Sequence, residues 1–385
     1  MLGRLLYDRK IRDRLWQAVI TLGLLGLIVY FVRNASDNMV KAGIAAGFDF
    51  LWRTSGIDVP FVLTGYQPSG NLWSLFWAGV ANTLFASVIA IALATMLGFL
   101  IGLARLSTHW LLSTVAGAYI EFVRNIPLLF FVLFWYFGVI ASLPQPRNSL
   151  AVGAGVYLNN RGLTIPTPLE ALPLQLAAFV IVAAALLFWL FARWALARKM
   201  RTGADAPTLW VGLLLLAVVP LGALAIAALS TPWDMPQAGR FNLRGGTVIV
   251  PEFVALVMAL VTYSAGFIAE VVRGGIVAVH KGQREAGSAL GLSTGQVLRH
   301  VIIPQAMRVI IPPMTSQYLN ILKNSSFGAA IAYPEVVSVF MGSALNNTGQ
   351  AIEIIAMVLA VYLFFGLVVS LAMNWFNARM ALVTR

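Results

Sequence analysis

The chain has 385 residues, of which 60% are hydrophobic and only 10% are charged, and this composition excludes a soluble globular protein. The formal net charge of +12 is scattered over the ends of apolar runs and forms no basic stripe, so we expect it to orient the chain in a membrane and not to bind nucleic acid. The sequence has no cysteine, which excludes thiol catalysis, iron–sulfur ligation and disulfide bonds. We therefore expect an all-α integral membrane protein in contact with a lipid bilayer.

About eight stretches are apolar over the roughly 20 residues that a helix needs to cross a bilayer. They are approximately residues 15–32, 72–104, 111–140, 171–192, 207–229, 251–272, 301–322 and 353–373. An even number of spans places both termini on one side. No small-residue cleavage site follows the first stretch, which favours a retained span over a cleaved signal peptide.

Lys and Arg residues are more frequent on one side of the expected spans than on the other. That side carries the N-terminal tail, the 193–201 loop and a polar segment at 281–304, and by the positive-inside rule it is cytoplasmic. The opposite side carries three longer connections, at 33–70, 141–170 and 231–250.

The first of these connections contains Phe50 and Trp52, which favour the headgroup boundary. The other two are rich in Pro, Gly and Asn and look irregular. Between them, the fourth and fifth stretches form a hairpin with no ionisable group in its middle, which we interpret as peripheral scaffold.

The third stretch combines charges with a helix breaker. Glu121 and Arg124 are three residues apart and can form an ion pair over one helical turn; the alternative is that Arg124 snorkels to the cytoplasmic boundary. Pro127 removes a backbone donor and should weaken or bend the helix. Glu270 and Arg273 repeat the spacing in the sixth stretch, near its cytoplasmic end, where a structural role is favoured.

The seventh stretch contains three prolines and ends in polar residues. Pro304, Pro312 and Pro313 remove backbone donors, so polar atoms should line its inner face. The polar residues at its end are Asn320, Lys323, Asn324, Ser325 and Ser326. Such a cluster suits a zwitterion whose carboxylate faces Lys323; the alternative is a helix cap at the outer interface.

Catalytic and nucleotide-binding motifs are absent from the sequence. His109, His280 and His300 are isolated, without a second ligand at metal spacing. The phosphate-binding pattern G-x-x-x-x-G-K-[ST] does not occur. We therefore expect no enzyme activity, cofactor or metal in this chain, and the energy for any active transport must come from elsewhere.

The polar segment 281–304 contains residues that are typical of a helix end and of a helix start. Apolar residues recur in it at helical spacing, namely Ala286, Ala289, Leu290 and Val297. Gly291 can take the left-handed conformation that ends a helix, and Ser293 with Gln296 forms a capping-box signature that begins another. The segment therefore predicts a helix–turn–helix projection that docks a partner in the cytoplasm.

This segment resembles the EAA loop of ABC importer permeases. The matching residues are Glu285, Ala286, Gly287, Gly291, Val301, Ile303 and Pro304, with small departures at 287, 301 and 303. The flanking sequences YIEFVRNIPLL, AEVVRGGI and LKNSSFG resemble those of the polar amino-acid (histidine/glutamine) permeases. The long form, with LPQP at 143–146, is similar to the larger permease subunit of general L-amino-acid and glutamate/glutamine/aspartate importers.

The resemblance implies a type I ABC importer transmembrane fold. Its core would be residues 72–376, interrupted by inserted loops and a hairpin at 145–247. An extra helix and a periplasmic loop at 1–71 would precede the core, and a cytoplasmic tail at 377–385 would follow it.

The same resemblance implies partners and site residues. The chain would lie in a bacterial inner membrane with both termini in the cytoplasm, and would form a heterodimer with a second permease. Two copies of a cytoplasmic ABC ATPase, which bind ATP and Mg, and a periplasmic amino-acid-binding protein would complete the importer. The ATPase-coupling residues would be Glu285, Ala286, Gly287, Gly291 and Pro304. The substrate-pathway candidates are Glu121, Arg124, Asn125, Lys323, Asn324, Ser325 and Ser326.

Two points about transport stay open at this stage. Relatives often have aspartate where Asn324 stands, so we expect neutral and acidic amino acids to be preferred over cationic ones. The alternative function is a secondary transporter driven by an ion gradient, with Glu121, Glu270 and Lys323 as ion-linked groups, although no inverted repeat is visible.

Overall fold

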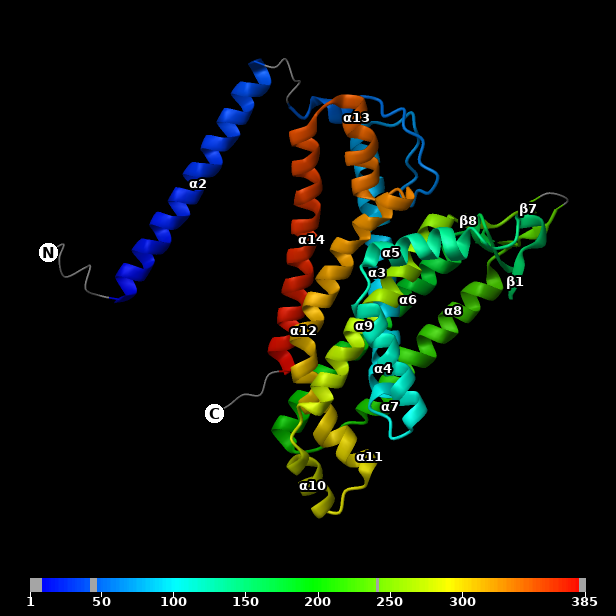
Figure 1. The fold of residues 1–385 in the computed structure, drawn as a ribbon. Helices are drawn as coiled ribbons and strands as arrows, with labels where there is room; N and C mark the ends of the chain where they lie inside the picture. Colours follow the sequence, from blue (N-terminus) through cyan, green and yellow to red (C-terminus); the bar gives the residue numbers. More distant parts are fainter. Residues whose placement is uncertain (1–8, 42–46, 240–241, 381–385) are drawn as a thin grey trace. The chain divides into compact units, whose positions relative to one another are not determined.

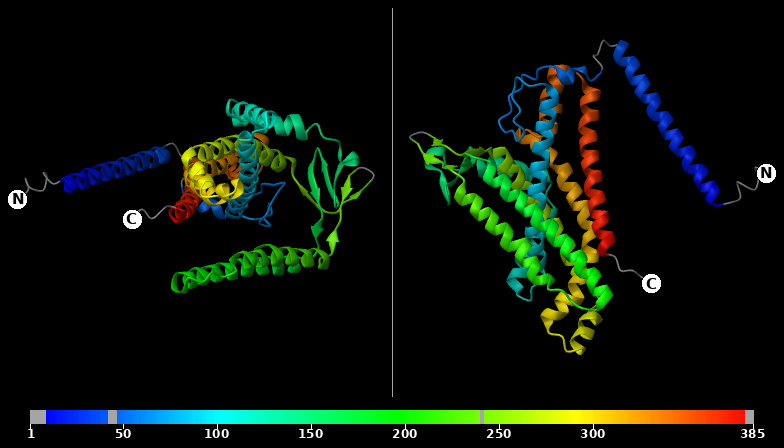
Figure 2. Two further views of the ribbon diagram at one scale, coloured as in Figure 1. Left: turned by 90° about the horizontal axis from the view of Figure 1, so that it is seen from below. Right: turned by 180° about the vertical axis from the view of Figure 1, so that it is seen from behind.

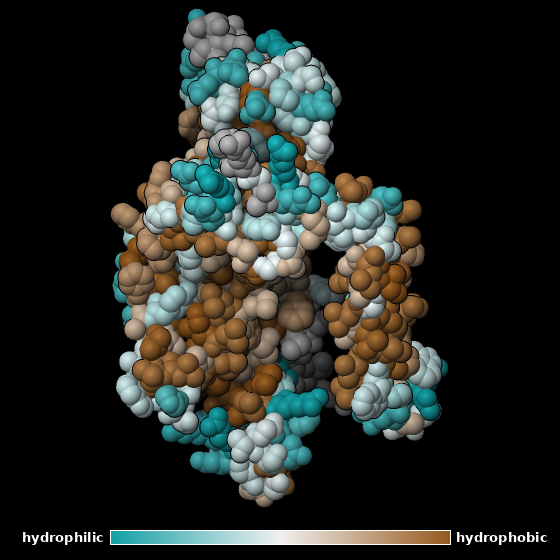
Figure 3. Space-filling model, turned by 90° about the vertical axis from the view of Figure 1, so that its right-hand side faces the viewer, coloured by the Kyte–Doolittle hydropathy of each residue, from teal (hydrophilic) through white to brown (hydrophobic). Residues whose placement is uncertain are grey.

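The computed structural model describes residues 9–41, 47–239 and 242–380. The chain divides into two compact units, unit 1 (Met1–Trp135 and Ala255–Arg385) and unit 2 (Tyr136–Val254), which Figures 1 and 2 show as ribbons. Helices make up most of the described residues, which confirms the predicted helical membrane class. Hydrophobic side chains cover much of the surface drawn in Figure 3.

Six helical segments in the described residues are long and apolar enough to cross a membrane. They are α2 (Arg9–Lys41), α3 (Leu72–Arg105), α6 (Leu172–Thr202), α7 to α8 (Thr208–Ser230, with α7 Thr208–Leu213, η4 Leu214–Val218 and α8 Val219–Ser230), α9 (Pro251–Val277) and α14 (Ala351–Met380). A seventh candidate is the bent pair of α4 (Trp110–Arg124) with α5 (Leu128–Leu133) and η2 (Phe134–Ile140).

The predicted seventh stretch also forms a helix, α12 (Ile303–Asn324), which continues through Pro312 and Pro313. It does not meet the apolarity criterion that the other candidates meet. The helices and turns that complete unit 1 are η1 (Asp49–Trp52), α10 (Lys281–Ala289), α11 (Thr294–Val297), η5 (Leu298–Ile302), η6 (Ser325–Ile331), η7 (Val337–Ala344) and α13 (Leu345–Thr348). The predicted tail at 377–385 lies partly within α14, and its last five residues are outside the described ones.

Glycines let the helices of unit 1 approach closely. A Cβ atom on Gly98 of α3 would lie 2.6 Å from the Cβ of Ile268 on α9, and one on Gly102 would lie 2.8 Å from the carbonyl of Ala269. Small residues four apart allow this kind of contact between membrane helices. Gly275 of α9 is similarly close to a side chain of α12, and α12 packs against α3 and α14.

Residues 47–71 cover one end of the bundle in unit 1. Phe50 is 1% exposed and packs in a core cluster with Leu75, Phe340 and Ile354. Residues distant in the sequence therefore bury the ring of Phe50, and its position at the headgroup boundary stays a prediction. Trp52, by contrast, is exposed.

The connections expected to be irregular in unit 2 form antiparallel sheets instead. A four-stranded sheet has the order β1 (Leu150–Gly153), β2 (Val156–Asn159), β3 (Gly162–Ile165), β8 (Thr247–Ile249). Two-stranded pairs join β4 (Thr167–Pro168) to β5 (Trp233–Asp234) and β6 (Gln237–Ala238) to β7 (Leu243–Arg244). A short turn, η3 (Pro146–Asn148), precedes them. Strands of two to four residues show no period-2 pattern that a sequence could reveal.

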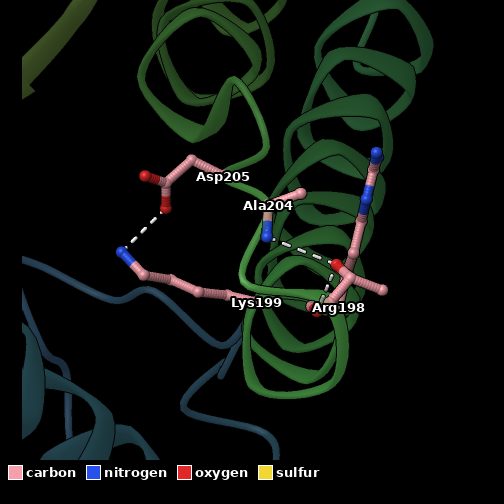
Figure 4. Close-up of polar contacts among 5 residues, drawn as sticks. Arg198, Lys199, Ala204 and Asp205 are labelled. Carbon is pink, nitrogen blue, oxygen red and sulfur yellow. Dashed lines mark hydrogen bonds and ion pairs between the residues drawn. The ribbon is translucent and has the colours of Figure 1, made fainter.

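The helical hairpin of unit 2 packs α6 against α8. At its turn, α6 ends at Gly203 with a φ of 70°, and the Thr202 hydroxyl donates to the Arg198 carbonyl at 2.9 Å. Lys199 forms an ion pair with Asp205 at 2.7 Å (Figure 4). Because both side chains are exposed, this ion pair contributes little to stability.

Candidate functional site

The polar segment folds as the predicted helix–turn–helix. The Nδ1 atom of His280 accepts a hydrogen bond from the Gly282 amide at 3.1 Å and caps α10. At the other end, Gly291 has a φ of 76°, its amide donates to the Ser288 carbonyl at 2.9 Å, and the Leu292 amide donates to the Gly287 carbonyl at 3.2 Å. This is the Schellman arrangement, in which a left-handed glycine ends a helix.

The next helix begins with the predicted capping box. The Ser293 amide donates to Oε1 of Gln296 at 2.9 Å, and the Gln296 amide donates to the Ser293 hydroxyl at 3.4 Å. The two donors at the start of α11 are thereby satisfied by side chains. Figure 1 shows α10 and α11 together at the end of unit 1 where α9 also ends.

A buried contact fixes α10 against α11. Val297 is 2% exposed, and Gly287 is buried beside it: a Cβ atom on Gly287 would lie 3.0 Å from a methyl carbon of Val297. This tight contact accounts for the glycine that stands where the EAA pattern has alanine. Gln305 on α12 adds a 3.3 Å hydrogen bond to Gln283.

One surface of this loop is exposed to solvent. Glu285, Ala286, Ala289 and Leu290 are all exposed, and Leu290 is 80% exposed. Pro304 is half-buried in the first turn of α12, where its missing amide hydrogen is tolerated. The loop therefore presents one carboxylate and an apolar ridge on a fixed backbone.

A second group of predicted residues lies where α4 breaks. The chain bends by 106° between α4, which ends at Arg124, and α5, which begins after Pro127, and this confirms the predicted bend. Two hydrogen bonds to Thr262 on α9 hold the bend: the Tyr119 hydroxyl donates to its carbonyl at 2.5 Å, and the Trp135 indole donates to its hydroxyl at 3.1 Å.

Two Glu–Arg pairs in the sequence have the same three-residue spacing, but in the part of the chain that the structure describes only one of them forms an ion pair. Within the described residues, no ion pair joins Glu121 to Arg124, whereas Glu270 and Arg273 form one at 2.6 Å. Asn125 instead donates to the Glu121 carbonyl at 2.7 Å. Arg124 is exposed, and its charge acts electrostatically on the Glu270 carboxylate of α9.

The polar end of α12 divides into exposed and buried parts. Lys323 is exposed and Asn324 is half-buried. Ser325 is fully buried and donates to the Leu322 carbonyl at 2.7 Å, while Ser326 donates to the Lys323 carbonyl at 2.8 Å. The following turn, η6, contacts α5, so the fold brings together the segments that follow the ends of α4 and α12.

Sequence reasoning missed Glu335, which is fully buried between η6 and η7. A carboxylate immediately before an apolar helical run is a signal for helix capping, and Glu335 precedes VVSVF. A further partner of Glu335, Tyr362, lies on the distant helix α14, and a sequence pattern does not reveal this contact.

Helices of membrane-spanning length, the bend after α4 and the capped helix–turn–helix are features of a multi-pass membrane protein. Comparison with known families agrees: residues 94–382 match the family described as "Binding-protein-dependent transport system inner membrane component", and the chain belongs to it. This membership favours an ABC permease over an ion-driven secondary transporter.

Several proteins are similar to the chain over nearly its whole length. It is 43% identical over 380 residues to the general L-amino acid transport system permease protein AapQ of Rhizobium johnstonii, covering 99% of this chain and 95% of the relative. It is 45% identical over 378 residues to the putative amino-acid ABC transporter permease protein YhdX of Escherichia coli, covering 97% and 95%.

The glutamate/glutamine/aspartate/asparagine transport system permease protein BztB of Rhodobacter capsulatus is 35% identical over 415 residues, covering 100% of this chain and 97% of the relative. A solved structure of an amino acid ABC transporter with histidines has a TM-score of 0.47 and 21% identity, covering 79% of this chain and 94% of that one.

Proposed function

We propose that the chain is the transmembrane permease subunit of an ATP-driven amino-acid importer. The observation that carries the proposal is the capped helix–turn–helix of α10 and α11, whose exposed face bears the residues that match the EAA loop. Membership of the family and the printed names of full-length relatives support amino acids as the cargo.

Coupling to ATP hydrolysis runs through this loop. Glu285, Ala286 and Leu290 are exposed and form a surface for a cleft of a cytoplasmic ATPase. Gly287 and Gly291 fix the shape of the loop, and Pro304 begins the helix that receives its movement. ATP and Mg bind to the ATPase, of which two copies serve the importer, so the role of this chain is mechanical.

Cargo recognition is assigned to the ends of α4 and α12. Arg124 and Lys323 are exposed cations, and within the described residues no hydrogen bond or ion pair holds either side chain. Each is able to meet the α-carboxylate that all amino acids share. Glu121, Asn125, Asn324 and Ser326 supply further polar groups nearby in sequence.

Asn324 carries no negative charge, so this residue provides no acidic partner for the side chain of a cationic amino acid. The proposed preference is for neutral and acidic amino acids, such as glutamine and glutamate. Uptake in which arginine competes more strongly than glutamate or glutamine would contradict this preference.

The assembly follows from the family. The chain forms half of the translocation pathway and pairs with a second permease, and a periplasmic binding protein delivers the cargo. Both termini lie on the cytoplasmic side of a bacterial inner membrane. Residues 1–71, the core 72–376 with its insert 145–247, and the tail 377–385 are the proposed divisions of the chain.

Charge reversal at Glu285 tests the coupling role. Glu285→Lys should abolish ATPase association or ATP-dependent uptake while the chain still inserts into the membrane. Glu170→Lys is the matched control, because Glu170 is also exposed but lies in unit 2. If Glu285→Lys leaves ATP-dependent uptake unchanged, the assignment of the loop is wrong.

A further inference from the structure

A buried carboxylate caps the helix that follows the end of α12. Glu335 has no exposed surface. Its Oε2 atom accepts from the Val337 amide at 2.9 Å, and its Oε1 atom accepts from the Ser338 amide at 2.7 Å. These are the first amides of η7, which have no partner within the helix, and a carboxylate satisfies them strongly.

Hydrogen bonds join this cap to α14 and to the turn after α12. The hydroxyl of Tyr362, on α14, donates to Oε2 of Glu335 at 3.2 Å. Two residues before Glu335, the Tyr333 amide donates to the Gly328 carbonyl of η6 at 2.9 Å. The connection that contains Glu335 is therefore bonded to α14 and to η6, the turn that directly follows Lys323 and Asn324.

Residues 333–336, which precede η7, form hydrogen bonds with α3. The Val336 amide donates to the Thr83 hydroxyl at 3.1 Å. The side-chain amide of Asn82 donates to the Pro334 carbonyl at 2.9 Å, and the Tyr333 hydroxyl donates to the backbone carbonyl of Asn82 at 3.0 Å. All these groups are buried, so each bond lost would leave an unsatisfied polar atom.

We propose that Glu335 is a positioning residue for cargo recognition: with Tyr362 it holds the connection 333–338 between α3 and α14, and this connection in turn holds η6 and the adjoining Lys323 and Asn324. The inference rests on the proposed function. It also changes the role of Ser325, whose fully buried hydroxyl serves the framework and does not touch the cargo.

The protonation state of Glu335 provides an independent readout. Burial raises the pKa of the Glu335 carboxyl to about 7, against the opposing effect of its amide and tyrosine hydrogen bonds. The titratable groups that face it are Tyr333 of the same connection and Tyr362 of α14, and neither ionises near neutral pH. Within the described residues, no cation pairs with Glu335.

The test measures glutamine uptake by the assembled importer, because the net charge of glutamine is constant between about pH 6 and pH 8. Tyr362→Phe removes one hydroxyl and keeps the ring, and Glu335→Gln keeps the shape but turns an amide donor towards a helix amide. Tyr66→Phe is the matched control, because the Tyr66 hydroxyl also forms part-buried hydrogen bonds, at 2.7 Å to the Ile57 carbonyl and at 2.7 Å with the Ser55 hydroxyl, but outside this network.

We expect Tyr362→Phe to raise the KM for glutamine about tenfold, the factor for loss of a hydrogen bond to a charged group, with little change in maximal rate or ATPase association. Glu335→Gln should raise KM as well and flatten the part of the pH profile of KM that is centred near pH 7. Tyr66→Phe should match the wild type.

The proposal is overturned if Tyr362→Phe and Glu335→Gln retain the wild-type KM and pH profile. It is also overturned if Tyr362→Phe lowers only the amount of assembled protein, which would indicate a purely structural role. If Glu335→Gln does not assemble, Tyr362→Phe alone decides. A wild-type importer that takes up no amino acid contradicts the proposed function instead.

Discussion

Gly291 offers the sharpest test of the coupling loop, because one backbone angle shapes the turn between α10 and α11. Its φ is 76°, and a Cβ atom at this position would meet no atom within 4 Å. Gly291→Ala therefore adds no clash. Its effect comes from the left-handed conformation, which costs an L-residue about 1–2 kcal/mol.

Gly295 provides a control in the same loop. It lies in α11 with helical geometry, and a Cβ atom there also meets no atom within 4 Å. Gly295→Ala should stabilise the helix by up to about 1 kcal/mol. The two variants make the same chemical change, yet they should differ by about 2 kcal/mol in the free energy of forming the loop, which is more than a tenfold difference in its population.

Hydrogen exchange of segment 281–304 and ATP-dependent uptake are the assays. Gly291→Ala should speed exchange in this segment and lower uptake per assembled complex, whereas Gly295→Ala should do neither. Equal exchange rates and equal uptake in the two variants would refute the reasoning, because the turn conformation would then have no bearing on the loop.

Three further predictions concern packing, capping and pH. Gly98→Ala should lower the thermal transition of the purified protein, because overpacking against Ile268 costs about 1–3 kcal/mol, whereas Gly23→Ala, with no atom within 4 Å, should not. Ser293→Ala should lose about 1 kcal/mol of helix stability, seen as faster hydrogen exchange confined to α11. Because burial raises the pKa of Glu335 to about 7, its contribution to the free energy of unfolding is full below about pH 4.5 and is lost as pH rises through 7. Thermal transitions measured across this range should depend on pH less in Glu335→Gln than in the wild type.

The sequence predicted those features that depend on neighbouring residues. Gly291, Ser293 and Gln296 set the turn and the cap through hydrogen bonds that span at most six residues, and the structure has all of them. Pro127 likewise acts on its own helix, and the 106° bend lies there.

Features that depend on distant residues escaped prediction. Phe50 lies in a core formed with α3, η7 and α14, and β3 pairs with β8 from a connection more than 80 residues away. The spacing of Glu121 and Arg124 permits an ion pair but does not require one, and among the described residues the ion pair at this spacing is the one between Glu270 and Arg273. Tyr362, a partner of Glu335, lies on α14, so the contact between them becomes apparent only in the fold.

The most direct test of the central claim is glutamine uptake into proteoliposomes that contain the chain assembled with a second permease, an ABC ATPase and a binding protein. The account predicts uptake that requires ATP on the side of α10 and α11 and that persists when ionophores collapse every ion gradient. Uptake that proceeds without ATP and stops when the gradients collapse would contradict it.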